Sequence, residues 1–437
     1  AVRAGLRAVD EHAAALGAVE LRGRAAGWAA ELAELGLRLA TGPRALLVAA
    51  ERARAIADRP PAVRPPRDRR LGGLLAELRR VSAEVPDHPE LLTAQARLED
   101  AVRAQCRRLS SSRDAVPGWG WLVPALIEAL DDRVLVEFVR VGEDLLAVTL
   151  ANGRCRRRFL GPYDAVRDDV RMLRFAVSRL ARDPDGAAAR SSLAATAGRL
   201  HHRLIEPLSV GERSLALAPV GALHGLPWPA LPSLVGRPLT VVPSAAGWLR
   251  AMRTPSSGGQ VALIAGPDLA HADEEIAAVR ARHPEARILT GSSATAAAAR
   301  SALDGASVAH VAAHGVFRAG NALFSGLRLA DGPLFTYDLE HLERSPRLLV
   351  LSACDAGRAE IYEGEAVIGM VTAALGFGTA TVVAAVTPVG DAAARDLMTG
   401  FHERLAAGAG PAEALAAAPR SVSALGFVCF GAGYDRA

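Results

Sequence analysis

Two short stretches decide the fold of this chain: Ser-Val-Ala-His-Val-Ala-Ala-His-Gly at residues 307–315 and Arg-Leu-Leu-Val-Leu-Ser-Ala-Cys-Asp-Ala-Gly at residues 347–357. Each is a brief apolar run that stops at a polar, reactive residue. Such runs are typical of buried strands in a parallel sheet. Because ligand sites in open α/β sheets lie beyond the carboxyl ends of the strands, His314 and Cys354 are predicted to share one edge. A thiol and an imidazole at one edge are the parts of an activated nucleophile.

The chain around these stretches alternates between short apolar runs and amphipathic segments. Strands are predicted at 214–218, 239–242, 261–265, 287–289, 308–313, 348–352 and 381–386. Helices are predicted at 245–253, 273–282, 294–303, 365–375 and 392–406. This alternation indicates an α/β fold with a mostly parallel sheet and helices on both faces.

Two further groups of strands are predicted outside that alternation. Residues 134–141 and 145–150 read as a hairpin, followed by a third strand at 154–160 and by helices at 165–182 and 187–207. A hairpin-like insert at 326–329 and 334–336 lies between the two deciding strands. Because of this position, we expect the insert to shape a substrate groove or lid.

The first 115 residues are predicted to be all helical, ahead of a second domain at 116–437 whose α/β part begins at residue 214. Apolar residues recur there at helical spacing, and the Arg- and Pro-rich stretch at 59–70 is predicted to be an exposed loop. The helices are either an irregular bundle or decayed tetratricopeptide-type repeats, since no clean period is present. We expect this region to bind a protein activator or regulator.

Composition excludes several function classes. The chain has 437 residues, a net charge of +4 and no Lys, so a P-loop and a Schiff-base mechanism are excluded. No concentrated basic run in the α/β part argues for nucleic acid. The four Cys are far apart and form no CxxC, so we expect no metal, no cofactor and a reducing, cytoplasmic setting. The uncharged stretch at 366–390 is broken by glycines and predicts a buried helix and strand rather than a membrane span.

The predicted reactive pair has structural alternatives. A free Cys is often simply a buried core residue, which is how we interpret Cys429. His310 and His314 are four residues apart, which suits a metal on a helix, but on a strand the two are about 13 Å apart. We therefore interpret His310 as structural and His314 as the base. Gly315 follows His314, and its N–H is predicted to contribute to an oxyanion hole.

These residues resemble the CHAT domain, a caspase-like family within the group of caspases, separases and gingipains. The resemblance rests on His-Gly at 314–315, Ser-Ala-Cys at 352–354, Leu-His-Gly-Leu-Pro at 223–227, Glu-Gly-Glu-Ala-Val-Ile-Gly at 363–369 and the segment 383–398. It implies a caspase-like fold and a cysteine endopeptidase. Cys354 would attack the scissile carbonyl as a thiolate, and His314 would accept and later return the proton.

The resemblance also leaves the substrate open. Ser352 stands where related peptidases carry an Asp that helps to bind a basic residue. Asp355, Glu363 and Glu365 are nearby acids that could take that part, although turn and capping roles are commoner for such residues. The family implies a protein substrate and a role in bacterial defence or cell death. The alternative is a non-catalytic scaffold that binds partners, whereas an α/β hydrolase is excluded by the lack of Gly-x-Ser-x-Gly.

Overall fold

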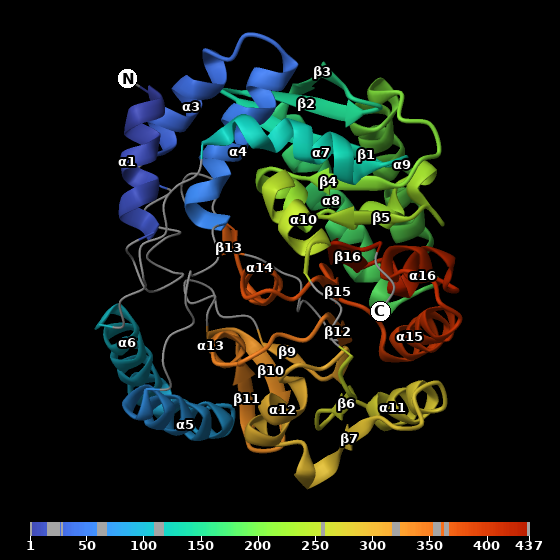
Figure 1. Ribbon diagram of the computed structural model, residues 1–437. Coiled ribbons are helices and arrows are strands. Elements are labelled where there is room, and N and C mark those ends of the chain that lie inside the picture. Colours follow the sequence, from blue (N-terminus) through green and yellow to red (C-terminus); the bar gives the residue numbers. More distant parts are fainter. Residues whose placement is uncertain are drawn as a thin grey trace.

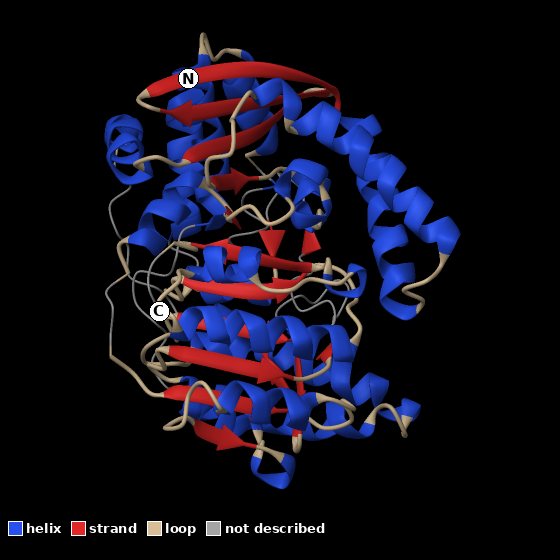
Figure 2. Cartoon of the chain, turned by 90° about the vertical axis from the view of Figure 1, so that its right-hand side faces the viewer, coloured by secondary structure: helices blue, strands red, loops and turns tan. Residues whose placement is uncertain are grey.

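A computed structural model describes residues 2–14, 27, 29–58, 68–108, 118–254, 258–316, 324–352, 360–361 and 367–434. Its centre is an eleven-stranded sheet with the strand order β3-β2-β1-β4-β5-β16-β15-β12-β8-β6-β7. Figure 2 shows these strands stacked as one continuous layer with helices against it. The fold is therefore the α/β class that the alternation of segments predicted.

The strands of this sheet are β1 (Val134–Val141), β2 (Asp144–Ala151), β3 (Arg154–Pro162), β4 (Leu215–Ala218), β5 (Leu239–Val241), β6 (Val261–Ala265), β7 (Arg287–Leu289), β8 (Val308–Ala312), β12 (Leu348–Ser352), β15 (Thr381–Ala385) and β16 (Phe427–Gly431). Two small sheets contain β9 (Gly315–Val316), β10 (Gly326–Leu329), β11 (Gly332–Phe335), β13 (Glu360–Ile361) and β14 (Val367–Ile368).

The helices are α1 (Val2–Ala14), α3 (Ala30–Arg38), α4 (Pro43–Asp58), α5 (Arg69–Glu84), α6 (Leu92–Arg108), α7 (Leu122–Leu130), α8 (Tyr163–Arg182), α9 (Ala187–Leu204), α10 (Ala245–Met252), α11 (Ala272–Arg280), α12 (Ala296–Leu303), α13 (Thr336–Glu340), α14 (Met370–Gly376), α15 (Asp391–Ala406) and α16 (Pro411–Ala417).

The sheet consists of two halves whose parallel strands run in opposite directions. β1, β4, β5 and β16 are mutually parallel neighbours, and β15, β12, β8, β6 and β7 are parallel to one another. The halves join where β16 pairs with β15 in the antiparallel sense. As a result, the carboxyl ends of β8 and β12 lie at one edge, and those of β1, β4 and β5 point the other way.

Both faces of the sheet are buried, as the residues of β1 illustrate. Val136 and Phe138 face one core, in which Phe138 packs against Trp228 with ring centroids 5.4 Å apart. Leu135 and Val139 alternate with them and face a second core together with residues of α4, α7 and α10. Burial on both sides explains why these strands are continuous apolar runs rather than alternating ones.

The N-terminal helices divide into two groups that contact different parts of the molecule. Helices α1, α3 and α4 lie beside the first half of the sheet, where Leu46 and Leu47 of α4 are fully buried. Helices α5 and α6 lie at the other end, beside β11 and α13 (Figure 1). The helical region therefore packs against the α/β part at two separate places.

Most predicted elements agree with the structure, and the differences occur at element ends. The strands at 134–141, 154–160 and 348–352 and the hairpin insert are confirmed. The helix predicted from residue 365 begins only at Met370, because residues 367–368 form β14 and Gly369 is extended. Arg69 and Arg70 belong to α5 rather than to a loop, since the Asp68 side chain accepts from Leu71 N and caps that helix. Residues 59–67 of that predicted loop lie outside the described residues.

In the described part of the chain, none of the helices has the length and apolar character needed to cross a membrane.

Candidate functional site

The candidate site lies where β8 and β12 end side by side. These strands are parallel, and Ala312 is the register partner of Ser352. His314 follows Ala312 by two residues. Cys354 follows Ser352 by two residues in the sequence and lies outside the described residues. The same holds for the three predicted substrate-binding acids, Asp355, Glu363 and Glu365.

The imidazole of His314 has a defined hydrogen-bond partner. Its Nε2 lies 2.9 Å from the main-chain oxygen of Asp268, in the segment that follows β6. A carbonyl oxygen only accepts hydrogen bonds, so Nε2 must be the nitrogen that carries the proton. In the neutral ring, Nδ1 is then the nitrogen that can accept a proton from another group. The side chain is half-buried at the edge of the sheet.

The main-chain conformation of Asp268 determines where its oxygen lies relative to His314. Its φ is +63°, a left-handed conformation that costs non-glycine residues on the order of 1 kcal/mol but that Asp adopts more readily than most. Gly266 allows the same segment to come close, since a Cβ there would lie 2.5 Å from Arg328 O. Arg328 also forms an ion pair with Asp268, with Nη2 and Oδ2 3.0 Å apart. The segment after β6 is therefore built to hold the imidazole of His314.

Gly315 and the hairpin insert continue this arrangement. Gly315 begins β9 and is the register partner of Leu327 in β10. The backbone N–H of Arg328 donates to the main-chain oxygen of His314 at 2.9 Å. The insert predicted to shape a groove thus pairs directly with the residues that carry the candidate base.

The helix α5 contacts the far strand of the insert, β11, through a hydrogen bond, and contacts the following helix α13 through a buried ion pair. Arg79 Nη2 lies 2.8 Å from Asp338 Oδ2, and Arg79 Nε donates to Pro333 O at 3.0 Å. Asp338 is 1% exposed and also accepts from the backbone N–H of Phe335 at 2.8 Å. A continuous set of contacts therefore runs from an N-terminal helix through β11 and β10 to His314.

His310 is not at the edge of the sheet but within its core. Its Nε2 lies 2.8 Å from Glu275 Oε1, and its Nδ1 lies 3.0 Å from Nε2 of His402 in α15. His402 in turn bonds to His283 through Nδ1 at 3.0 Å. Burial and the two neighbouring histidines hold the pKa of His402 well below its usual value. This chain of side chains links α11, β8 and α15, as expected for a structural His310.

At the carboxyl edge of the other half of the sheet, Arg54 of α4 contacts the segments that follow the strands. Arg54 donates to the main-chain oxygens of Pro219 and Pro243, which follow β4 and β5, at 2.7 and 3.0 Å. Its Nε also lies 3.1 Å from the buried Glu137 of β1. Burial and the nearby Arg54 lower the pKa of His224 to about 3, so this histidine is neutral.

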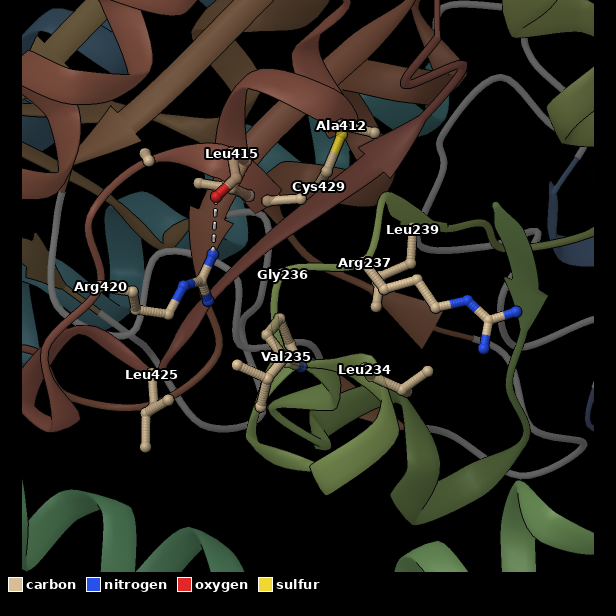
Figure 3. A pocket seen from close by; sticks show the side chains of 13 residues that line it. Leu234, Val235, Gly236, Arg237, Leu239, Ala412, Leu415, Arg420, Leu425 and Cys429 are labelled. Carbon is tan, nitrogen blue, oxygen red and sulfur yellow. Dashed lines mark hydrogen bonds between the residues drawn. The ribbon is translucent and has the colours of Figure 1, made fainter. Parts of the chain in front are cut away.

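A pocket beside α16 is shown in Figure 3. Leu234 and Val235 lie on one side of it, and Leu415 and Cys429 on the other. Arg420 is the charged group that faces Leu415, and its Nη atoms donate to Leu415 O and Phe427 O at 3.3 and 3.0 Å. The first bond caps the end of α16 and the second connects it to β16, which gives Arg420 a structural role. Neither His314 nor Gly315 lines this pocket.

The partner of His314 could not be found by searching the sequence for an orienting acid. The acceptor is a main-chain oxygen, which any residue provides, and the side chain of Asp268 points its carboxylate to Arg328. Among the residues described, no three His, Cys, Asp or Glu side chains converge in the way that a metal ion requires.

The comparisons with known proteins agree with this geometry. The model of the CHAT domain family matches residues 194–425, more than half of the chain. Two crystal structures of the Saccharomyces cerevisiae separase–securin complex share the fold, with TM-scores of 0.55 and 0.53 at 11% and 10% identity. They are matched over 94% and 95% of this chain but only 37% of the separase chain.

A complex of the pro- and mature domains of RgpB from Porphyromonas gingivalis gives a TM-score of 0.36 at 12% identity, over 62% of this chain and 77% of that one. No curated protein sequence gives a significant match. The family model, the strand order and the edge at His314 lead to one conclusion. The chain belongs to the CHAT domain family, and its fold is that of the caspase-like cysteine peptidases.

Proposed function

We propose that the protein is a cysteine endopeptidase with Cys354 as nucleophile and His314 as base. The observation that carries the proposal is the pairing of Ala312 with Ser352 in adjacent parallel strands. Neighbouring strands are about 4.8 Å apart, and we expect the two residues that follow this pair by two positions, His314 and Cys354, to come within reach of each other. The fixed proton on Nε2 of His314 supports the same assignment, because it leaves Nδ1 to accept the thiol proton.

The chemistry follows from these roles. Cys354 loses its proton to His314, and the resulting thiolate attacks the scissile carbonyl. The protonated imidazole then gives its proton to the amine, which leaves, and the acyl group remains bound to Cys354 as a thioester. A water molecule, deprotonated by the same imidazole, then hydrolyses the thioester. The N–H of Gly315 is proposed to stabilise the oxyanion, and Asp355, Glu363 and Glu365 are proposed to bind the substrate.

We also propose that residues 1–115 regulate the peptidase domain at 116–437 by binding a protein partner. The contact of Arg79 with Asp338 supports this, because it connects α5 to the insert that pairs with Gly315. The separase in the similar crystal structures is itself in complex with a protein, securin. A cytoplasmic location and a role in bacterial defence or cell death are proposals that rest on the family alone.

The proposal is tested by cleavage of protein substrates. The parent chain, Cys354→Ala and His314→Ala are incubated with a denatured protein mixture and with candidate partner proteins, and new N-termini are identified by mass spectrometry. We expect new termini with the parent and none with Cys354→Ala or His314→Ala. Equal patterns for all three proteins would support the scaffold function instead.

A further inference from the structure

An open cavity of about 400 Å³ lies at the outer end of the sheet, away from the candidate catalytic edge. Its floor is formed by residues of β1, β2 and β3, and its wall by the segment before β4. The lining residues are Val134, Thr149, Ala151, Asn152, Arg154, Arg156, Leu208, Ser209, Val210 and Arg213. Three of them are arginines, and none is acidic. The cavity is therefore a strongly positive one.

Two of these arginines have no partner in the described part of the chain. Arg154 and Arg156 are exposed, and neither side chain forms a hydrogen bond or ion pair with a described residue. Some other exposed arginines of the described chain form ion pairs, as in Arg167–Asp164 at 2.8 Å and Arg190–Asp185 at 3.0 Å. No described acid therefore neutralises the guanidinium groups of Arg154 and Arg156 at the cavity.

The hairpin that carries the two arginines is held in place from both sides. Asn152 and Gly153 form its turn with φ of +49° and +71°. Arg213 Nη1 donates to Asn152 Oδ1 at 3.3 Å, and Arg44 Nη2 donates to Gly153 O at 3.3 Å. Because residues two apart on a strand share a face, Arg154 and Arg156 face the cavity together, and Arg157 faces the opposite side.

The side chains that line the cavity indicate the class of ligand that fits it. Guanidinium groups match the oxygens of a phosphate group with paired, charge-assisted hydrogen bonds. The cavity contains no aromatic side chain on which a base could stack, so recognition of single-stranded nucleic acid is not favoured. The aliphatic residues Val134, Leu208 and Val210 lie beside the arginines and provide an apolar flank.

We propose that this cavity is a binding site for a phosphate monoester or pyrophosphate group, held by Arg154, Arg156 and Arg213. Eight strand spacings separate β3 from β8, or roughly 38 Å along the sheet, so the site is distinct from the one at His314. The group is either part of a free phosphate compound or a phosphorylated side chain of a partner protein. The proposal does not depend on peptidase activity.

The test is isothermal titration calorimetry of the full chain with pyrophosphate in about 0.1 M salt. We expect binding to the parent and a loss of roughly a hundredfold in the double variant Arg154→Gln/Arg156→Gln, because two charge-assisted interactions are removed. Both side chains are exposed and unpaired, so the variant should fold normally. Arg157→Gln is the matched control, with the same change on the other face of β3, and it should bind like the parent.

Absence of binding to the parent, or an affinity of the double variant within about twofold of the parent, would overturn the proposal. A competition experiment identifies the source of the group. A phosphoserine peptide that displaces pyrophosphate, where its unphosphorylated copy does not, would assign the site to a modified protein. A peptide that leaves pyrophosphate bound would assign it to a free phosphate compound.

Discussion

The Nε2 atom of His314 lies 2.9 Å from the main-chain oxygen of Asp268, and this contact fixes which nitrogen of the imidazole carries the proton. The base is therefore oriented by the backbone rather than by an acidic side chain. Since Asp268 has a φ of +63°, the position of its oxygen depends on a conformation that few residues adopt.

The first prediction concerns that backbone conformation. Asp268→Gly should leave the reactivity of Cys354 close to that of the parent, because glycine adopts positive φ without cost. The lost ion pair with Arg328 is exposed and contributes little. Asp268→Val should lower the alkylation rate of Cys354 near neutral pH by about tenfold, since a β-branched residue strongly disfavours this φ. Equal rates for the two variants would show that the oxygen does not position His314.

The second prediction concerns the contact between α5 and the insert. Arg79→Gln should destabilise the protein by about 2 kcal/mol, because the buried Asp338 then keeps only its longer ion pair with Arg300, at 3.7 Å. The effect is measured by denaturant unfolding. Arg80→Gln is the matched control on the next residue, whose partner Glu84 is exposed, and it should cost less than about 0.5 kcal/mol. Similar losses for both variants would mean that the buried pair does not secure the insert.

The third prediction concerns acid stability. The pKa of His402 is held well below its value in the unfolded chain, because burial and the neighbouring His310 and His283 disfavour its charged form. The unfolded chain therefore binds more protons than the folded chain below about pH 6.5. As a result, the free energy of unfolding decreases as the pH falls below this value. The melting temperature should decrease from about pH 7.5 to about pH 5. His402→Gln should flatten this slope, and the exposed His88→Gln should not. An unchanged slope in His402→Gln would contradict this account.

Much of the fold could be predicted from the sequence because its strands are distinctive. The buried strands β8, β12 and β15 are short runs made mostly of Val, Leu and Ala, although β8 also contains His310. The joining of two oppositely directed halves through β16 could not be predicted. That pairing depends on contacts between segments far apart in the chain, which local patterns do not encode.

The site was predictable only where side chains carry the chemistry. The sequence indicates His314 and Cys354 because a reactive residue ends each of two apolar runs. Asp268 acts through its main-chain oxygen, and Arg79 acts through a contact with a residue that is distant in sequence. The cavity at β3 had a visible signal, the Arg-Cys-Arg-Arg-Arg run at 154–158, but this run precedes the alternating part that begins at residue 214.

The assignment of Cys354 and His314 as a reactive pair is tested most directly by alkylation of each Cys with iodoacetamide across pH, followed by mass spectrometry. Burial raises the pKa of Cys155 and raises that of Cys429 to about 12, so both thiols serve as slow internal references. Pairing with an imidazole lowers the pKa of a thiol by several units from about 8.5. We predict that Cys354 reacts rapidly below neutral pH in the parent and slowly in His314→Ala. A Cys354 that reacts like an ordinary thiol, at the same rate in both proteins, would contradict the account.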